Sequence, residues 1–582
     1  EENEWCGLAM QLEIDCPGHP IHWLLEDTTW EIGGEANGAV LVQQDMTSID
    51  LEQKVTKDNT FSTKERFFKP EDEIDVGDSQ RGAIPIDMMP RSGGACILDF
   101  QAKDDLALVL FSEKPDQTRV RIEKFSSENV IHYMDRPTFA MTENAIAPER
   151  KLLVYRHPQK LQRHEWRNLW LDTFVEVRKR VHASYDFELE IPRPTAWAFM
   201  WNFDLDVYME DWTLPLIDAL PEYKRLGYVD LFTHGVFDGA SNDPEYTGGN
   251  VCLNYDYKYC PEYGGPEAMK KLFDAAKEQG MRTWQWFGLY LIPRKNIPAG
   301  SKDLLQENPD WNQLNSVGEP FGGAGRMRSS FREYLFDCIK TIRDETGLEG
   351  AFWDSYQNTG LVNLDYRADD KAPHTEEIWR FQADLQKIGI HQRVESVSIF
   401  GISTIGIYGM KDDTAAWDIR RRWWENSVEN DDLFAWLDCA PAFFSENSFS
   451  KDVLPPSVYF KFLAHRSAPT LSAFPWGPNT PKGDHVPTPG PKLPGQDLSE
   501  EYGHVNRMYN TALPFMSRMR IIEGGKYVLW LDSDNQAAVA WAFEDCEIEH
   551  SGPITDLDPD TKSEADGTAS LKAGHAYLLG DR

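Results

Sequence analysis

Short apolar runs separated by polar turns fill the first part of the chain, up to residue 162. Several of these runs alternate apolar and polar residues, and strands with this spacing are typical of antiparallel sandwiches. We therefore predict an N-terminal β-sandwich over residues 1–162. Its clearest strands are expected at residues 39–43, 95–100, 106–111 and 119–124.

The pattern then becomes helical. Over residues 163–185, apolar side chains recur at three- and four-residue steps, as at Trp166, Leu169, Trp170 and Phe174. This period places them on one face of a helix. We expect residues 163–190 to form a linker helix between the sandwich and the following region.

Residues 191–517 alternate between apolar strand-like runs and amphipathic helical stretches. Helices of this length between strands imply parallel βαβ units, and about eight such units predict a (β/α)8 TIM-type barrel. A doubly wound sheet is the alternative, but no glycine-rich phosphate loop follows the first strand. Strands are expected at residues 195–203, 229–236, 282–292, 350–356, 392–399, 405–410, 433–437 and 470–474, and helices at 266–279, 329–346 and 375–387.

Proline and glycine are frequent over residues 475–499, which predicts a loop. Strand-like runs return at residues 526–531, 537–543 and 576–579, so we expect a small C-terminal β-domain over residues 518–582. The predicted protein is thus multidomain, with a β-sandwich, a central barrel and a small β-domain in that order.

The charge of the chain narrows its partners. Its 95 Asp and Glu residues outnumber 59 Lys and Arg residues, which gives a formal net charge of −36. Nucleic acids and anionic membranes need a basic surface, so we expect the chain to bind neither. A strongly polyanionic substrate would need a local basic pocket to offset this field. No apolar run reaches the about 18 residues that a membrane-spanning helix requires.

The eight cysteines include no CxxC pair, which argues against a zinc site built from cysteines. Two pairs are close in sequence and could form disulfides, Cys6 with Cys16 and Cys252 with Cys260. The chain begins at Glu1 rather than at Met, which favours a removed leader, and we expect a secreted or periplasmic protein. The sequence does not indicate an oligomeric state.

Acidic residues at the expected strand ends are candidates for catalysis, because active sites of TIM-type barrels form at the carboxyl ends of the strands. Asp354 ends the apolar run of the fourth strand, and Glu395 stands in the fifth. Glycosidic cleavage requires such a pair, one carboxylate as nucleophile and one as acid and base. We predict these roles for Asp354 and Glu395. The alternatives are a structural Asp that caps a turn and a buried Glu paired with Arg393.

Asp412 and Asp413 follow the sixth strand and compete for the acid/base role, although tandem Asp residues are also common in turns and helix caps. Other side chains near the expected strand ends could bind sugar hydroxyls or stack on a sugar ring. They are Trp201, Asp204, Asp206, His234, Asp238, Trp284, Trp286 and Tyr290.

Other chemistries have little support in the sequence. It contains no GxSxG elbow and no HExxH motif, and we expect neither a metal ion nor a cofactor. The expected partner is an oligo- or polysaccharide substrate. Two other functions stay open, a polysaccharide lyase with Tyr356 or His234 as base and a glycan-binding protein without catalysis.

Three segments within residues 266–356 together resemble the α-galactosidase superfamily, and glycoside hydrolase family 36 in particular. They are AMKKLFDAAKEQGMRTWQWF, SKDLLQENPDWN and SSFREYLFDCIKTIRDETGLEGAFWDS. The resemblance implies a barrel with flanking β-domains and Asp354 as the nucleophile. The Lys-x-Asp signature of the family is replaced by Phe-Trp-Asp, and its glycine-rich acid/base motif is absent.

An Asp on the fourth strand with a Glu on the fifth is closer to the related families 101 and 129. The resemblance therefore implies an α-galactose-type substrate: a galactoside, an N-acetylgalactosaminide or an anhydrogalactoside. It also implies a retaining mechanism through a covalent glycosyl-enzyme, without a cofactor.

Overall fold

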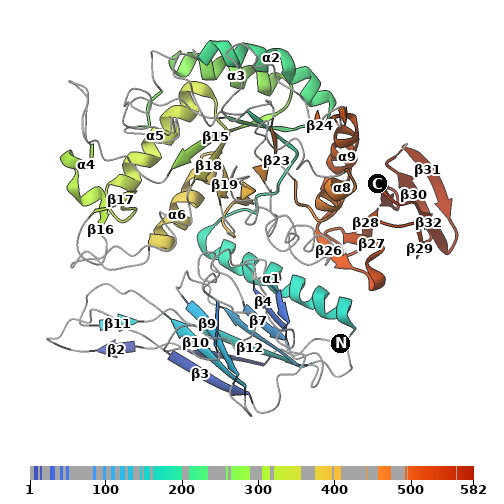
Figure 1. Ribbon diagram of the computed structural model, residues 1–582, viewed down its shortest axis with the longest axis horizontal. Helices are drawn as coiled ribbons and strands as arrows, with labels where there is room; N and C mark the ends of the chain where they lie inside the picture. Colours follow the sequence, from blue (N-terminus) through green and yellow to red (C-terminus); the bar gives the residue numbers. More distant parts are fainter. Residues whose placement is uncertain are drawn as a thin grey trace.

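The computed structural model describes the backbone of strand segments in the first part of the chain and most of the helices and strands that follow (Figure 1). The described residues are 6–10, 13–15, 17, 27–32, 40–43, 48–50, 83–86, 96–99, 106–111, 118–124, 129–135, 144–146, 150–156, 162–198, 209–233, 257–259, 264–288, 304–314, 320–354, 374–395, 399–404, 406–407, 442–443, 456–468, 470–472, 492–493, 496–497, 499–558 and 560–582.

The strands before residue 157 pair in antiparallel fashion, in a six-stranded sheet of order β1-β12-β8-β7-β4-β5, a four-stranded sheet of order β3-β10-β9-β6 and a two-stranded sheet of β11 and β2. The four strands expected from the clearest apolar runs correspond to β4, β7, β8 and β9. That the two larger sheets form a sandwich stays a prediction. The strands are β1 Cys6–Met10, β2 Glu13–Asp15, β3 Asp27–Ile32, β4 Val40–Gln43, β5 Ser48–Asp50, β6 Ala83–Ile86, β7 Cys96–Asp99, β8 Leu106–Phe111, β9 Thr118–Lys124, β10 Asn129–Asp135, β11 Asn144–Ile146 and β12 Arg150–Arg156.

Helix α1 (Arg163–Tyr185) has the bounds of the apolar period, but it ends before residue 190, the predicted end of the linker helix, because Asp186 adopts a left-handed conformation at its end. Gln162 and Glu165 form a capping box at its start, which satisfies backbone N–H groups that have no partner within the helix. Asp172 on this helix accepts hydrogen bonds from Arg518 and Arg520 of the C-terminal region. The helix is thereby attached to strand β26 (Arg518–Ile521).

A ring of parallel strands forms the centre of the molecule. Its order is β20-β19-β18-β15-β14-β13-β23-β22-β21, and only residue 405 separates β20 from β21, the two ends of this order. One chain segment therefore lies at both edges and closes the sheet into an eight-membered ring, as in a TIM-type barrel. The strands are β13 Thr195–Ala198, β14 Asp230–Thr233, β15 Arg282–Gly288, β18 Gly350–Asp354, β19 His391–Glu395, β20 Ile402–Thr404, β21 Gly406–Ile407, β22 Ala442–Phe443 and β23 Thr470–Ser472.

One strand of the ring differs from the prediction. The seventh position is held by Ala442–Phe443, whereas we expected residues 433–437, which lie outside the described residues. Both segments are short and apolar, and periodicity does not distinguish runs of this length.

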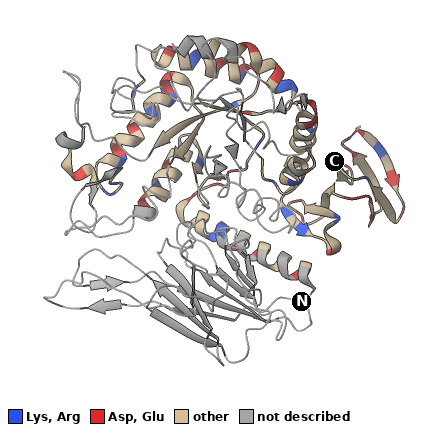
Figure 2. Cartoon of the chain, in the orientation of Figure 1, with Lys and Arg blue, Asp and Glu red and all other residues tan. Residues whose placement is uncertain are grey.

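Helices cover the outside of the ring, and acidic and basic residues alternate along them (Figure 2). They are α2 Met209–Arg225, α3 Gly265–Glu278, α5 Phe331–Thr346, α6 His374–Lys387, α8 Pro456–Ala464 and α9 Ser499–Ala512. Helix α3 ends as predicted before Gly280, which has a φ of 70°. None of the helices in the described part of the chain is long and apolar enough to cross a membrane.

Two further groups of elements complete the description. Between β15 and β18 lie α4 Leu304–Glu307, the short helix Pro309–Trp311, β16 Asn312–Leu314 and β17 Pro320–Gly325, and within the predicted loop lie β24 Lys492–Leu493 and β25 Gln496–Asp497. After residue 517 a six-stranded and a two-stranded antiparallel sheet follow. Their strands are β26 Arg518–Ile521, β27 Tyr527–Leu531, β28 Ala537–Ala542, β29 Cys546–Glu549, β30 Gly552–Asp556, β31 Thr561–Ala565, β32 Thr568–Leu571 and β33 Ala576–Leu579.

Candidate active site

The two predicted catalytic acids are the last residues of neighbouring parallel strands. Strand β18 ends at Asp354 and strand β19 ends at Glu395. The strands pair in register as Phe352 with Arg393 and Trp353 with Val394, so the next step along this register joins Asp354 and Glu395. Adjacent strands lie about 4.8 Å apart. The backbone therefore brings the two acids to the same edge of the ring.

Both acids also share a face of the sheet by position. Phe352 packs with aromatic rings of the next two strands of the ring, with its centroid 4.6 Å from Trp286 on β15 and 5.1 Å from Phe232 on β14. Side chains alternate between faces along a strand, so Asp354 stands at a position of the same parity as Phe352. Trp353 has the opposite parity, and its ring lies 5.5 Å from Phe381 of the outer helix α6.

A buried hydrogen bond fixes the relative position of the two strands one residue before the acids. The indole Nε1 of Trp353 donates to Oε1 of Gln392 on β19 at 2.8 Å, and both side chains are fully buried. The Gln392 Nε2 donates in turn to the carbonyl oxygen of Ile390 at 2.7 Å. A buried amide paired on both sides resists a shift in register, because a shift would leave polar atoms without partners.

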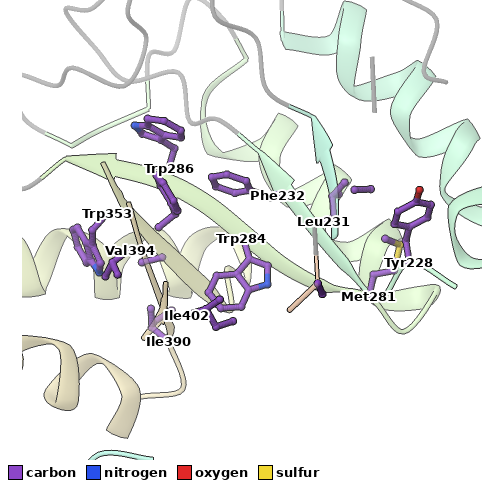
Figure 3. Packing of buried hydrophobic residues seen from close by; sticks show 14 of the residues in the cluster. Tyr228, Leu231, Phe232, Met281, Trp284, Trp286, Trp353, Ile390, Val394 and Ile402 are labelled. Atoms are coloured by element: carbon purple, nitrogen blue, oxygen red, sulfur yellow. The ribbon is translucent and has the colours of Figure 1, made fainter. Parts of the chain in front are cut away.

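The two predicted sugar-binding tryptophans of β15 lie in the core (Figure 3). Trp284 is 0% and Trp286 1% exposed, so neither ring presents a free face to a sugar. Trp284 is the third residue of its strand and packs over Gly350, where a Cβ atom would come within 2.3 Å of the indole. We therefore correct the interpretation of both residues from sugar binding to packing. An aromatic-rich strand has the same sequence pattern in either case.

A layer of polar side chains lies beneath the aromatic layer of Phe232, Trp286 and Phe352, towards the amino ends of the strands. Asp230 is fully buried and accepts two hydrogen bonds from Arg282, at 2.7 and 2.8 Å. The guanidinium of Arg393 is also fully buried; its Nη2 donates to Thr195 Oγ1 at 3.1 Å and lies 3.7 Å from Asp230 Oδ2. Burial lowers the pKa of Arg393 to about 10, although the negative charge of Asp230 opposes this shift. The same carboxylate outweighs the burial of Arg282 and raises its pKa.

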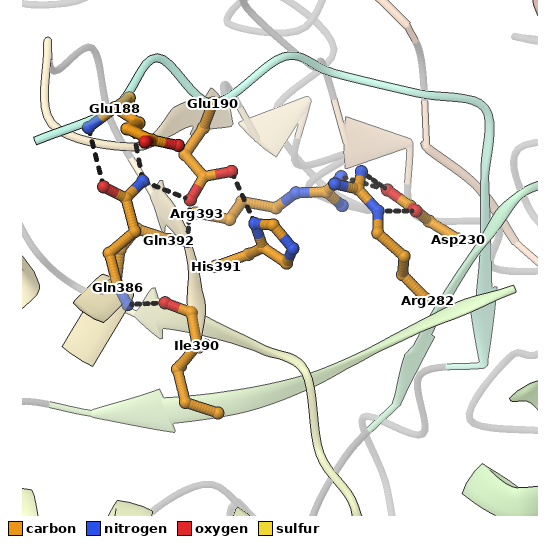
Figure 4. A network of polar contacts seen from close by, with 9 residues as sticks. All are labelled: Glu188, Glu190, Asp230, Arg282, Gln386, Ile390, His391, Gln392 and Arg393. Atoms are coloured by element: carbon orange, nitrogen blue, oxygen red, sulfur yellow. Dashed lines mark hydrogen bonds and ion pairs between the residues drawn. The ribbon is translucent and has the colours of Figure 1, made fainter. Parts of the chain in front are cut away.

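A second buried acid lies beside this layer (Figure 4). Glu190 is 4% exposed and precedes the first strand of the ring. Its oxygens accept from Gln386 Nε2 at 2.8 Å and from the backbone N–H of Gln392 at 3.1 Å, and it pairs with His391 Nδ1 at 2.9 Å. Sequence reasoning missed Asp230 and Glu190, and it considered Arg393 only as a partner for Glu395. The alternation in Arg393-Val394-Glu395 was a usable signal, because it assigns Arg393 to the face of Glu395.

The other predicted site residues lie outside the described part of the chain. These are the acid/base candidates Asp412 and Asp413 and the sugar-binding candidates Trp201, Asp204, Asp206, His234, Asp238 and Tyr290. Within the described residues, no three His, Cys, Asp or Glu side chains gather in a way that could hold a metal ion.

Comparisons with known proteins locate the chain by its fold. No family model matches the sequence, and no curated protein matches it. A cycloalternan-degrading enzyme from Trueperella pyogenes has a TM-score of 0.55 at 11% identity, covering 98% of this chain and 84% of that one. An α-N-acetylgalactosaminidase from Bifidobacterium bifidum, solved with GalNAc, has a TM-score of 0.51 at 12% identity, covering 96% of this chain and 85% of that one.

The galactosidase domain of an α-galactosidase–sucrose kinase also has a TM-score of 0.51, at 11% identity, with 100% of this chain and 79% of that chain covered. At such low identity the likeness concerns the fold and not the reaction. The chain has the fold of multidomain glycoside hydrolases built on a TIM-type barrel.

Proposed function

We propose that this protein is a glycoside hydrolase that cleaves an α-galactose-type linkage and retains the anomeric configuration. The proposal rests on the positions of Asp354 and Glu395, which are the last residues of neighbouring parallel strands. They follow directly after the paired residues Trp353 and Val394, and the alternation of side chains along the strands assigns both acids to the same face of the sheet. Acids that end adjacent strands at the mouth of a barrel can reach the short carboxylate separation that retaining enzymes need, because their backbones are about one strand spacing apart.

In the proposed reaction, a carboxylate oxygen of Asp354 attacks the anomeric carbon while the glycosidic C–O bond breaks. Glu395 gives its proton to the departing oxygen, so the leaving sugar departs as an alcohol. Glu395, now a carboxylate, then takes a proton from a water molecule that attacks the same carbon and releases Asp354. Two inversions give a product with the configuration of the substrate.

The sugar class rests on the sequence resemblance and on two of the structural neighbours. The names of those neighbours specify an α-N-acetylgalactosaminidase and an α-galactosidase. The third neighbour degrades cycloalternan, so related folds accept more than one sugar. The linkage proposed for this chain is accordingly a galactoside, an N-acetylgalactosaminide or an anhydrogalactoside.

Nitrophenyl α-glycosides of galactose, N-acetylgalactosamine and glucose, together with anhydrogalactose-containing oligosaccharides, test the proposal. We expect turnover of a galactose-type substrate by the wild type and none by Asp354→Asn. The matched control is Asp274→Asn, which removes an exposed carboxylate on α3 that pairs only with Lys270 among the described residues. Proton NMR in the first minutes should show the α-anomer. Full activity of Asp354→Asn, or a β-anomer as first product, would contradict the proposal.

A further inference from the structure

The guanidinium of Arg393 has more hydrogen-bond donors than its surroundings use. It is fully buried, and its Nε and Nη1 have no hydrogen-bond partner in the described part of the chain. The indole Nε1 of Trp284 is also buried and without an acceptor there. The ring of Trp284 lies 4.7 Å from the Arg393 Cζ, so these groups belong to one small region inside the ring. Buried donors without acceptors are costly and are usually satisfied by a bound species.

The neighbouring carboxyl groups do not supply the missing acceptors. Asp230 is engaged by Arg282 through two hydrogen bonds and lies 3.7 Å from Arg393 at its closest oxygen. Glu190 is engaged by Gln386, His391 and the backbone of Gln392 (Figure 4). Among the described residues, Asp230 is thus the one carboxylate within 4.0 Å of the Arg393 guanidinium, and it is shared with Arg282; the negative charge of Glu190 acts on both groups from further away. A guanidinium with unused donors in a dry interior is expensive.

We infer that this interior layer, centred on Arg393, is a binding site for one small monovalent anion of halide size. The anion would accept hydrogen bonds from Arg393 and balance the second guanidinium group. Along the strands, Trp286 and Phe352 stand between Trp284 and the edge where the two acids end their strands, and their rings contact each other. The site is therefore distinct from the proposed sugar site, and its occupancy does not depend on the proposed reaction.

The charge of the whole chain makes the inference specific. With a net charge of −36, the protein repels anions in general, and added salt screens this self-repulsion whichever anion it contains. Screening does not depend on which anion is present, and the general effects of an anion on protein stability act alike on the wild type and on a variant without the site. A response to anion identity that is lost with Arg393 therefore reports a local site. Anion identity is therefore the variable to test.

Crystals of the full chain grown in sodium bromide give the direct test. We expect an anomalous difference peak within hydrogen-bond distance of Nε or Nη1 of Arg393. In solution, we expect the unfolding midpoint of the wild type to be about 2–4 °C higher in bromide or chloride than in gluconate at equal ionic strength, since ligands that bind the folded state stabilise it.

Two variants connect that shift to the site. Arg393→Gln should abolish the difference between halide and gluconate. Arg466→Gln should keep it: Arg466 is also buried over a tryptophan, 4.9 Å from the Trp530 ring, but its Nη1 donates to the carbonyl oxygen of Met516. If Arg393→Gln does not fold, the bromide crystals decide alone. Water density at Arg393 without an anomalous peak, or a halide effect that survives in Arg393→Gln, would overturn the inference.

Discussion

Asp354 and Glu395 lie one register step beyond the pair of Trp353 and Val394, at the ends of β18 and β19. The strands that carry the two acids are locked together by the hydrogen bond from Trp353 to Gln392 on the opposite face. Since a misplacement of about 1 Å can reduce catalysis about 100-fold, this bond should matter for the reaction as well as for the fold.

Replacing Trp353 with Phe tests that link. The change removes the indole donor and leaves the buried Gln392 oxygen without a partner, which should cost about 1–3 kcal/mol in the free energy of unfolding. We also expect kcat to fall more than KM rises, because the strand ends would be less well positioned. Trp379→Phe is the control, since the Nε1 of this buried tryptophan has no hydrogen-bond partner in the described part of the chain. Equal kcat values for the two variants would show that the bond supports folding only.

The identity of the proton donor is a separate prediction. Glu395→Gln should lose about 10²–10⁴-fold in kcat on substrates with poor leaving groups, because a positioned general acid contributes about that much. It should lose far less on dinitrophenyl glycosides, whose leaving group departs without a proton. Asp412→Asn and Asp413→Asn should respond alike to both substrates. If either shows the leaving-group dependence and Glu395→Gln does not, that aspartate is the acid.

Removing the carboxylate of Asp230 should strongly destabilise the barrel. Asp230→Asn removes the carboxylate that Arg282 and Arg393 share, and breaking a buried pair in this way costs about 3–5 kcal/mol. Denaturant unfolding measures the loss, with Asp274→Asn at an exposed ion pair as the control expected to change little. A loss below about 1 kcal/mol for Asp230→Asn would mean that the layer is not a charged network.

The sequence predicted those parts of the molecule that local pattern determines. Helix α1 has a regular apolar period and a capping pair, and the bounds of this period agree with the structure. Strand β18 is a short apolar run that begins at Gly350, as predicted, and includes Asp354; the predicted end at residue 356 lies outside the described residues. Long, periodic segments and runs with clear boundaries are readable because their own residues decide the conformation.

The rest depends on contacts that are distant in sequence. Whether Trp284 faces a sugar or the core is decided by Gly350 and Arg393, which belong to other strands of the ring. The link between Arg393 and Thr195 spans 198 residues, so no local pattern indicates it. Strand β22 has two residues, too few for any period to distinguish it from the apolar run at residues 433–437.

Buried tyrosines predict a loss of stability at alkaline pH. Tyr228, Tyr459 and Tyr502 lie in the core where α8 and α9 pack, with the rings of Tyr459 and Tyr502 4.1 Å apart. Burial raises the pKa of all three phenols above the ordinary value, and neighbouring tyrosines add to the shift for Tyr459 and Tyr502. Below about pH 10 the phenols are protonated in both the folded and the unfolded chain, so their contribution is fully present.

Above about pH 10 the unfolded chain releases these protons first, and the free energy of unfolding should fall as pH rises towards the higher folded-state pKa values. Circular dichroism and tyrosinate absorbance, followed together, measure this: the absorbance of these residues should rise only as helical signal is lost. Tyr459→Phe removes one phenol from the core and should make the decline with pH less steep. Ionisation of all tyrosines in a chain that keeps its helical signal would contradict the prediction, because it would mean that the phenols reach water in the folded state.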